Sequence, residues 1–265
     1  MCEANVYVRR NGQEELFMER VDRIVPGTDD SIFMENIFGE RRVVKARIQE
    51  MELVHHRILL EEIKTSLGKH YEELWLDLGT EHGHFHEGEE VTLKVYKGYN
   101  MNPNLGIDFL KLQAFMVDNG QVQPLKLQEH HGVMEITLGR AIQGLAQIYV
   151  HEKGEPDLYA TVLVEVGHHH HGIKPVGLPL EIVPSEYSHA RLGSDYGIQV
   201  LKDGQPLVGA EVRVTYNSTD NSDYPYHLTT DAEGRARLFL TAHGDYLFSV
   251  TDGNVISTYT LIKNF

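Results

Sequence analysis

Seven of the sixteen histidines fall in two short tracts, and the only cysteine of the chain occupies position 2. The tracts read GTEHGHFHEGEE and GHHHHG. Thiolate and imidazole are the donors that proteins offer to late transition metals such as nickel, cobalt, copper and zinc. The sequence therefore indicates metal binding before any other chemistry. The histidines of the two tracts are His82, His84, His86, His168, His169, His170 and His171.

Cys2 follows the initiator Met1, whose removal leaves a thiol beside a free α-amine. The reference pKa values are about 7.7 to 8.0 for the amine and about 8.5 for the thiol, so a metal displaces weakly held protons. Two such ends from two chains would offer two sulfurs and two nitrogens, a set that suits square-planar nickel(II) or copper(II). We include the neighbouring Glu3 as a candidate ligand. The alternative is a frayed terminus that bears a chance cysteine.

The first tract alternates histidine with Gly83 and Phe85. An extended backbone would therefore place its three imidazoles on one side, where they form a partial site for nickel, cobalt, copper or zinc. Glu81 and Glu87 could add carboxylate oxygens. The alternative is a solvated polar loop.

The second tract lies inside the chain and runs into KPVGLPLEIVP, so it does not resemble a purification tag. Four consecutive imidazoles cannot all bind one ion in one rigid geometry, which favours capture or exchange of metal over a closed structural site. The two tracts flank the same predicted domain and could meet in space. Candidates of second rank are His55, His56, His130, His131, His151 and His243.

Composition limits the possible partners. The chain holds 24 Lys and Arg against 39 Asp and Glu, a net charge of -15 that disfavours nucleic acid and anionic membranes and favours cations. No apolar run approaches the roughly 20 residues of a membrane span. The first residues, MCEANVYVRRNGQEEL, lack the apolar core of a signal peptide, so we expect a cytoplasmic protein without membrane insertion.

Alternating segments separated by turn dipeptides predict an all-β protein. Residues 43–63 carry both an alternating and a helical period, and we interpret them as two strands joined near residues 49–52. The turn dipeptides are Asn11-Gly12, Asn119-Gly120, Asp203-Gly204 and Asp252-Gly253.

We predict three domains. Residues 1–64 form a small barrel, and residues 65–79 form a connector that docks through Leu74, Trp75, Leu76 and Leu78. Residues 80–177 form a first β-sandwich with the histidine tracts near its first and last strands, and residues 178–265 form a second sandwich.

The segments MCEANVYV, LFMERVDRIVP and ENIFGERRVVKARIQEMELVHHRILLEE resemble the CooT family of small nickel-binding proteins. The resemblance covers residues 1 to about 63. It implies a barrel like that of Src-homology-3 domains, a homodimer, and nickel bound by Cys2 for maturation of carbon monoxide dehydrogenase. CooT proteins end near residue 65, whereas this chain continues for 200 residues, so its client and delivery route could differ.

Residues 80–265 resemble a family of nickel-transport-associated domains of unknown function built of immunoglobulin-like sandwiches. The resemblance rests on HGHFHEGEEVTLKVYKG, VGLPLEIVP and LKDGQPLVGAEVRVTY, and TTDAEGRARLFLTAHGDYLFSV is similar to transthyretin-like sandwiches. Members of this family usually carry a signal peptide, which this chain replaces with the CooT-like module.

These observations favour a nickel metallochaperone or carrier over an enzyme. The chain lacks HExxH, GxSxG and glycine-rich phosphate loops. The sequence therefore does not favour a hydrolase or a nucleotide-binding enzyme. We expect a homodimer formed through the first domain, with a nickel enzyme or nickel transporter as its partner. The alternative is a non-catalytic sandwich module for binding or adhesion with general affinity for divalent cobalt, zinc or copper.

Overall fold

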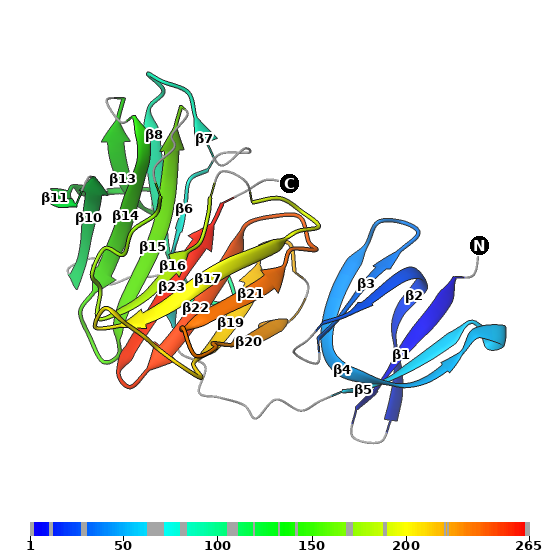
Figure 1. Cartoon of the computed structure of the whole chain (residues 1–265). Helices are drawn as coiled ribbons and strands as arrows, with labels where there is room; N and C mark the ends of the chain where they lie inside the picture. The colour runs from blue at the N-terminus through cyan, green and yellow to red at the C-terminus, as the bar shows by residue number, and fades with distance from the viewer. Residues whose placement is uncertain are drawn as a thin grey trace. The chain divides into compact units, whose positions relative to one another are not determined.

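The computed structural model comprises two compact units, which we describe separately (Figure 1). The first unit contains Met1–His70 and Thr219–His227, and the second contains Tyr71–Ser218 and Leu228–Phe265. Among the residues whose structure is described, no helix is long and apolar enough to cross a membrane. The described residues are 3–10, 13–27, 31–62, 72–79, 84–104, 111–118, 120–131, 133–140, 143–167, 172–187, 190–219, 221 and 223–262.

Five strands of the first unit close into a barrel, as predicted. Neighbouring strands pair antiparallel, and β1 closes the barrel by pairing in parallel with β5. Successive side chains of a strand point to opposite faces, which explains the core of the barrel. Ala4, Val6 and Val8 of β1 all point inward and are at most 8% exposed. The strands are β1 (Ala4–Arg10), β2 (Gln13–Pro26), β3 (Ser31–Asn36), β4 (Arg41–Glu52) and β5 (Arg57–Glu62).

Residues 43–62 form two strands, as predicted, but the turn comes later than expected. β4 continues through Glu52, and a single 3-10 turn, η1 (Leu53–His55), leads to β5. A register shift between Ile48 and Glu50 lets β4 stay paired with β5 beyond the predicted turn. The reversal is completed at His56, which adopts a left-handed φ of 52°.

Three sheets contain the remaining strands. The largest has the order β11-β10-β14-β15-β23-β22-β19-β20, with the short β7 also on β15. A five-stranded sheet contains β12, β13, β8, β6 and β9, and a four-stranded sheet contains β16, β17, β18 and β21. The strands are β6 (Glu73–Asp77), β7 (His84–Phe85), β8 (Val91–Tyr99), β9 (Asn102–Pro103), β10 (Leu112–Asp118), β11 (Gln121–Leu125), β12 (Leu127–His130), β13 (Val133–Gly139), β14 (Gly144–Glu152), β15 (Asp157–Val166), β16 (Leu180–Pro184), β17 (Asp195–Lys202), β18 (Gln205–Pro206), β19 (Glu211–Tyr216), β20 (Tyr226–Thr229), β21 (Arg235–Phe239), β22 (Tyr246–Asp252) and β23 (Val255–Leu261).

The two smaller sheets cover opposite faces of the large one. Ile256 of β23 belongs to the same buried cluster as Leu74 of β6 and Leu93 of β8, so this face packs on the five-stranded sheet. Tyr259, three residues later and on the other face, shares a hydrogen bond of 2.9 Å between hydroxyls with Tyr196 of β17. Two sandwiches therefore form, as predicted, but they share one continuous sheet.

Parallel pairing of β15 with β23 joins the sandwiches. The register runs from Asp157 opposite Val255 to Val162 opposite Thr260. Sequence alternation cannot reveal such a pairing, because it links strands nearly 100 residues apart. It makes the second unit one body rather than two independently folded domains.

The turn dipeptides lie at hairpins, as predicted. Asp203 and Gly204 both have positive φ, 48° and 76°, which is the type I′ geometry that this pair favours. The dipeptides at 119–120 and 252–253 also connect antiparallel neighbours. Asn11 and Gly12 lie outside the described residues, between strands that pair antiparallel.

The predicted connector contributes β6, which carries a buried charge. The Glu73 carboxylate is fully buried and accepts hydrogen bonds from the Arg213 guanidinium of β19 and the Ser249 hydroxyl of β22. The Thr258 hydroxyl of β23 donates to the Leu74 carbonyl at 2.5 Å. β6 thereby belongs to the five-stranded sheet and is also bonded to the second half of the large sheet.

We expect Arg213→Met to destabilise the second unit by about 3 kcal/mol, because a buried carboxylate then loses its compensating charge. The double variant Glu73→Met/Arg213→Met should cost less than the two single changes added together. Urea unfolding monitored by tryptophan emission measures the free energy of unfolding of each variant. Trp75 is a suitable probe because it lies in β6 and is the single tryptophan of the chain.

Lys202→Met is the matched control, since it removes the exposed ion pair between Lys202 and Asp252. Its unfolding midpoint should change little. An equal shift for Lys202→Met and Arg213→Met would show that burial of Glu73 has no special role.

Candidate metal centre

The start of β1 is held against the turn between β4 and β5. The Asn5 amide donates to the His56 carbonyl at 2.7 Å, and His56 Nδ1 lies 2.8 Å from the Glu3 carbonyl oxygen. Parallel pairing continues this contact with Asn5 opposite Arg57. The His56 imidazole is therefore fixed on the residue that follows Cys2 in the sequence.

The His56 contact also sets the tautomer of the ring. A carbonyl oxygen only accepts, so His56 Nδ1 carries a hydrogen and donates a hydrogen bond to the Glu3 carbonyl oxygen. The neutral ring then keeps a lone pair on Nε2. Histidines that bind metals commonly donate their second nitrogen to a backbone carbonyl in this way. His56 thus shares one feature with histidines that bind metals, and the sequence ranked it second among the candidates.

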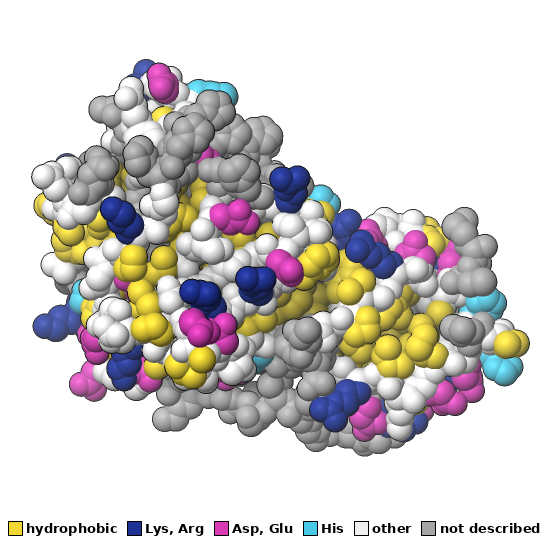
Figure 2. Space-filling model, in the orientation of Figure 1, with side chains coloured by type: hydrophobic (Ala, Val, Ile, Leu, Met, Phe, Trp, Pro, Cys, Tyr) yellow, Lys and Arg dark blue, Asp and Glu magenta, His cyan; other side chains and the backbone are white. Residues whose placement is uncertain are grey.

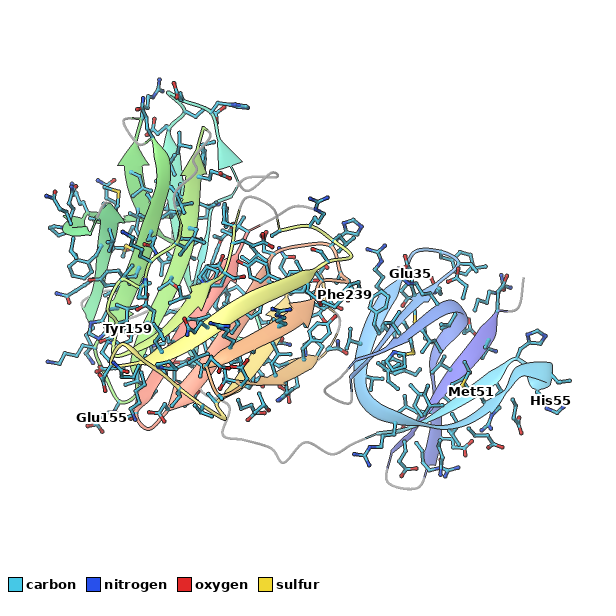
Figure 3. All side chains as sticks on the ribbon, in the orientation of Figure 1. Glu35, Met51, His55, Glu155, Tyr159 and Phe239 are labelled. Atoms are coloured by element: carbon cyan, nitrogen blue, oxygen red, sulfur yellow. The ribbon has the colours of Figure 1, made fainter. Side chains whose placement is uncertain are left out.

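Apolar and imidazole side chains surround this end of the barrel. His55 projects from the outer tip of the β4–β5 hairpin, with Met51 on the same hairpin (Figure 3). Met51 and Val54 are exposed, 51% and 88%, and Leu16 of β2 is also exposed. Figure 2 shows a further group of hydrophobic side chains on the visible face of the barrel, away from the hairpin tip that carries His55. Exposed apolar surface of this kind marks interaction sites.

The first histidine tract is attached to the end of β15. β7 pairs in parallel with that strand, with His84 opposite Glu165 and Phe85 opposite Val166. The Gly167 amide extends the pairing by donating to the Phe85 carbonyl at 3.0 Å. Residues 84–86 therefore lie beside the residue that precedes the second tract.

Phe85 anchors this loop in the core of the first sandwich, where it is 6% exposed. Since neighbouring side chains of an extended chain alternate, His86 leaves the backbone on the side away from the core. A turn follows, in which the His86 amide donates to Glu89 Oε2 at 2.9 Å and the Glu89 amide donates to the His86 carbonyl at 3.1 Å. His86 is exposed.

Two carboxylates accompany the histidine loop. A Cβ placed on Gly167 would lie 3.5 Å from Glu87 Oε1, so the Glu87 carboxylate lies next to the chain that enters the second tract. Glu165 points to the opposite face from the core residues Val164 and Val166 and is largely buried. The sequence named Glu87 as a possible oxygen donor but missed Glu165, although the alternation of YATVLVEV places it off the core face.

The chain after the second tract is also fixed. Glu181, in β16, accepts hydrogen bonds from the amides of Val176, Gly177 and Leu178 at 2.6, 3.0 and 3.3 Å. Burial raises the pKa of the Glu181 carboxyl, and the three N–H donors lower it. The Lys174 carbonyl accepts from the Gln147 side chain at 2.9 Å. Both ends of the second tract are therefore tied to the sandwich.

Most predicted ligands lie outside the described residues. Those are Cys2, His82, His168, His169, His170 and His171, and the side chain of His84 is likewise not described. Glu3 is half-buried and contributes its carbonyl to His56. Within the described ranges, no group of three His, Cys, Asp or Glu side chains is arranged to hold a metal.

Two family models match the chain. The model "CO dehydrogenase accessory protein CooT" matches residues 1–61, and a domain of unknown function, DUF4198, matches residues 56–252. These matches confirm both resemblances that the sequence motifs indicated. No curated protein matches the chain.

Among solved structures, the chain is similar to a putative CooT from Carboxydothermus hydrogenoformans at 49% identity, over 24% of this chain and 100% of that one, with a TM-score of 0.23. An Escherichia coli alpha-2-macroglobulin matches at 12% identity over 87% of this chain and 16% of that one, with a TM-score of 0.29. The D0–D1 domain of intimin matches at 17% identity over 73% of this chain and 97% of that one, with a TM-score of 0.24.

The DUF4198 match spans well over half of the chain, from the end of the barrel through the shared sheet. The chain therefore belongs to the DUF4198 family and carries a CO dehydrogenase accessory domain of the CooT type at its amino-terminal end.

Proposed function

We propose that this protein binds nickel and carries it, without catalysis, to a nickel enzyme during maturation. The CooT domain supports an accessory role in nickel enzyme maturation. The observation that carries the nickel assignment is the contact of 2.8 Å between His56 Nδ1 and the Glu3 carbonyl oxygen, which fixes an imidazole on the residue that follows Cys2. The cytoplasmic location stays a prediction.

The amino-terminal site would use sulfur and nitrogen donors. Cys2 supplies a thiolate and, after removal of Met1, the α-amine, and Glu3 is its neighbour. His56 adds an imidazole whose ring is already held by the hydrogen bond between Nδ1 and the Glu3 carbonyl oxygen. Thiolate with nitrogen donors suits nickel(II) in a square-planar arrangement.

The histidine site would collect metal before transfer. His82, His84, His86 and His168 to His171 supply only imidazoles, which bind nickel less tightly than a thiolate chelate and release it more readily. The pairing of β7 with β15 supports a single composite site, because it brings the backbone of the first tract beside the residues that precede the second. Glu87 adds a carboxylate beside Gly167.

A homodimer through the barrel is part of the proposal. The exposed Leu16, Met51 and Val54 offer apolar surface near the amino-terminal end. Two chains paired there would bring two Cys2 residues to one interface. The nickel enzyme, or a nickel transporter, is the proposed partner.

Cys2→Ala should abolish the thiolate-to-nickel absorption that appears on titration of the processed protein with nickel. His56→Asn should weaken nickel affinity at that site about tenfold, the usual effect of losing an imidazole or its support near a metal. Asparagine tolerates the left-handed φ of 52° at this position, so the turn is retained.

His130→Ala is the control for His56→Asn, because it removes an exposed imidazole from a hairpin of the second unit. It should leave the absorption unchanged. Full nickel affinity in both Cys2→Ala and His56→Asn would refute the amino-terminal site.

In a Cys2→Ala background, alanine at His82, His84 and His86 should remove the remaining tightly bound nickel. Alanine at His168, His169, His170 and His171 should do the same. If the tracts form one site, the combined variant loses no more nickel than either set alone, since coupled residues are not additive. Equilibrium dialysis with nickel measures the stoichiometry.

His130→Ala/His131→Ala is the matched control, because these two rings also neighbour each other, with centroids 4.3 Å apart. It should bind the same amount of nickel as its parent. Independent, additive losses from the two tracts would contradict a composite site, and unchanged stoichiometry would exclude the tracts from binding.

A further inference from the structure

An open cleft of about 200 Å³ lies in the second unit where β6, β8 and the β8–β9 turn meet the ends of β19 and β22. Its aromatic wall is formed by Trp75 and Tyr96, which stack with ring centroids 5.7 Å apart and planes inclined by 27°. Met101 and Pro103 line another part. None of these side chains has a role in the proposed metal sites.

Carboxylates supply the charge of the cleft. Asp77 and Asp245 both line it, and no lysine or arginine does so among its described lining residues. The Gly79 amide donates to Asp77 Oδ1 at 2.8 Å, and the Asn217 side chain donates to Asp245 Oδ2 at 3.2 Å, so both carboxylates are oriented. The cleft is therefore a negative, partly aromatic environment.

A buried hydroxyl faces this space without a partner. Thr260 lines the cleft and is 1% exposed, and its Oγ1 has no hydrogen-bond partner among the described residues. A buried hydroxyl left without a partner is costly, whereas a ligand with a polar group could satisfy it. Thr260 therefore points to a ligand rather than to a structural use of the cleft.

The Tyr96 ring connects the aromatic wall to the charges. Burial raises the pKa of its hydroxyl, the nearby Asp77 carboxylate raises this pKa further, and the Lys94 ammonium lowers it. Lys94 lies opposite Asp77 in the register of β6 and β8 and does not line the cleft. Aromatic faces next to carboxylates attract organic cations, because ring quadrupole and negative charge act in the same direction.

We propose that this cleft binds a small organic ammonium compound. The aromatic pair contacts the ammonium group, Asp77 and Asp245 balance its charge, and a polar group of the ligand bonds to Thr260. Asp77, Asp245 and the Asn217 amide supply too few ligands to hold a transition metal. The cleft is therefore not an alternative to the histidine sites for nickel. The inference is independent of nickel binding.

The test is a titration of the full chain with choline, in the presence of a chelator and at low salt, with tryptophan emission as the readout. Trp75 is the single tryptophan, so a saturable change reports this cleft. The neutral isostere 3,3-dimethyl-1-butanol should bind at least tenfold more weakly.

Asp77→Asn and Asp245→Asn should each weaken choline binding fivefold or more, and Thr260→Val should also weaken choline binding.

Glu129→Gln is the matched control, because it removes one exposed carboxylate of the same unit outside the cleft and should leave choline affinity unchanged. Circular dichroism confirms that each variant is folded. Equal binding of choline and its neutral isostere, or the absence of a saturable change, would overturn the proposal. A response to glucose but not to choline would also overturn it and assign the cleft to sugars. Nickel binding measured on the same samples separates this result from the metal proposal.

Discussion

One edge of β15 organises the second unit. The first six residues of the strand, from Asp157, pair in parallel with β23, and its last two, Glu165 and Val166, pair with β7 on the same edge. The first pairing fuses two sandwiches into one body, and the second brings the loop of the first histidine tract to the point where the second begins. Strand length therefore determines where imidazoles can meet. A shorter β15 would leave the sandwich joined but give the loop no backbone to pair with.

The two proposed nickel sites differ in what the fold must supply. At the barrel, closure by β1 and β5 orients a histidine through a backbone carbonyl, so geometry is set before metal arrives. At the sandwich, the fold fixes the residues beside the tracts, through Phe85 on one side and Glu181 on the other. The first arrangement favours retention of an ion, and the second favours rapid capture. A carrier benefits from both.

Local signals in the sequence were sufficient to predict the barrel, the sandwiches and the hairpins. Turn dipeptides such as Asp203-Gly204 impose positive φ on both residues, and alternation identifies the inward face of each strand. Features that depend on distant partners were not predictable. The parallel pairing of Thr258 with Ala160, the late turn at His56, and the burial of Glu73 against Arg213 all arise from tertiary contacts that one sequence window does not contain. The same limit applies to the candidate site, because the contact of His56 with the Glu3 carbonyl joins residues more than fifty positions apart.

Closure of the barrel has a consequence for biosynthesis. The first strand of the chain completes the barrel by pairing with the fifth, so the contact between Glu3 and His56 cannot form until more than fifty residues have been translated. A nascent chain emerging from the ribosome therefore exposes its first residues without the imidazole that the folded barrel presents to them. Any use of this imidazole, including the proposed binding of nickel, is thereby postponed until the module has left the exit tunnel and folded.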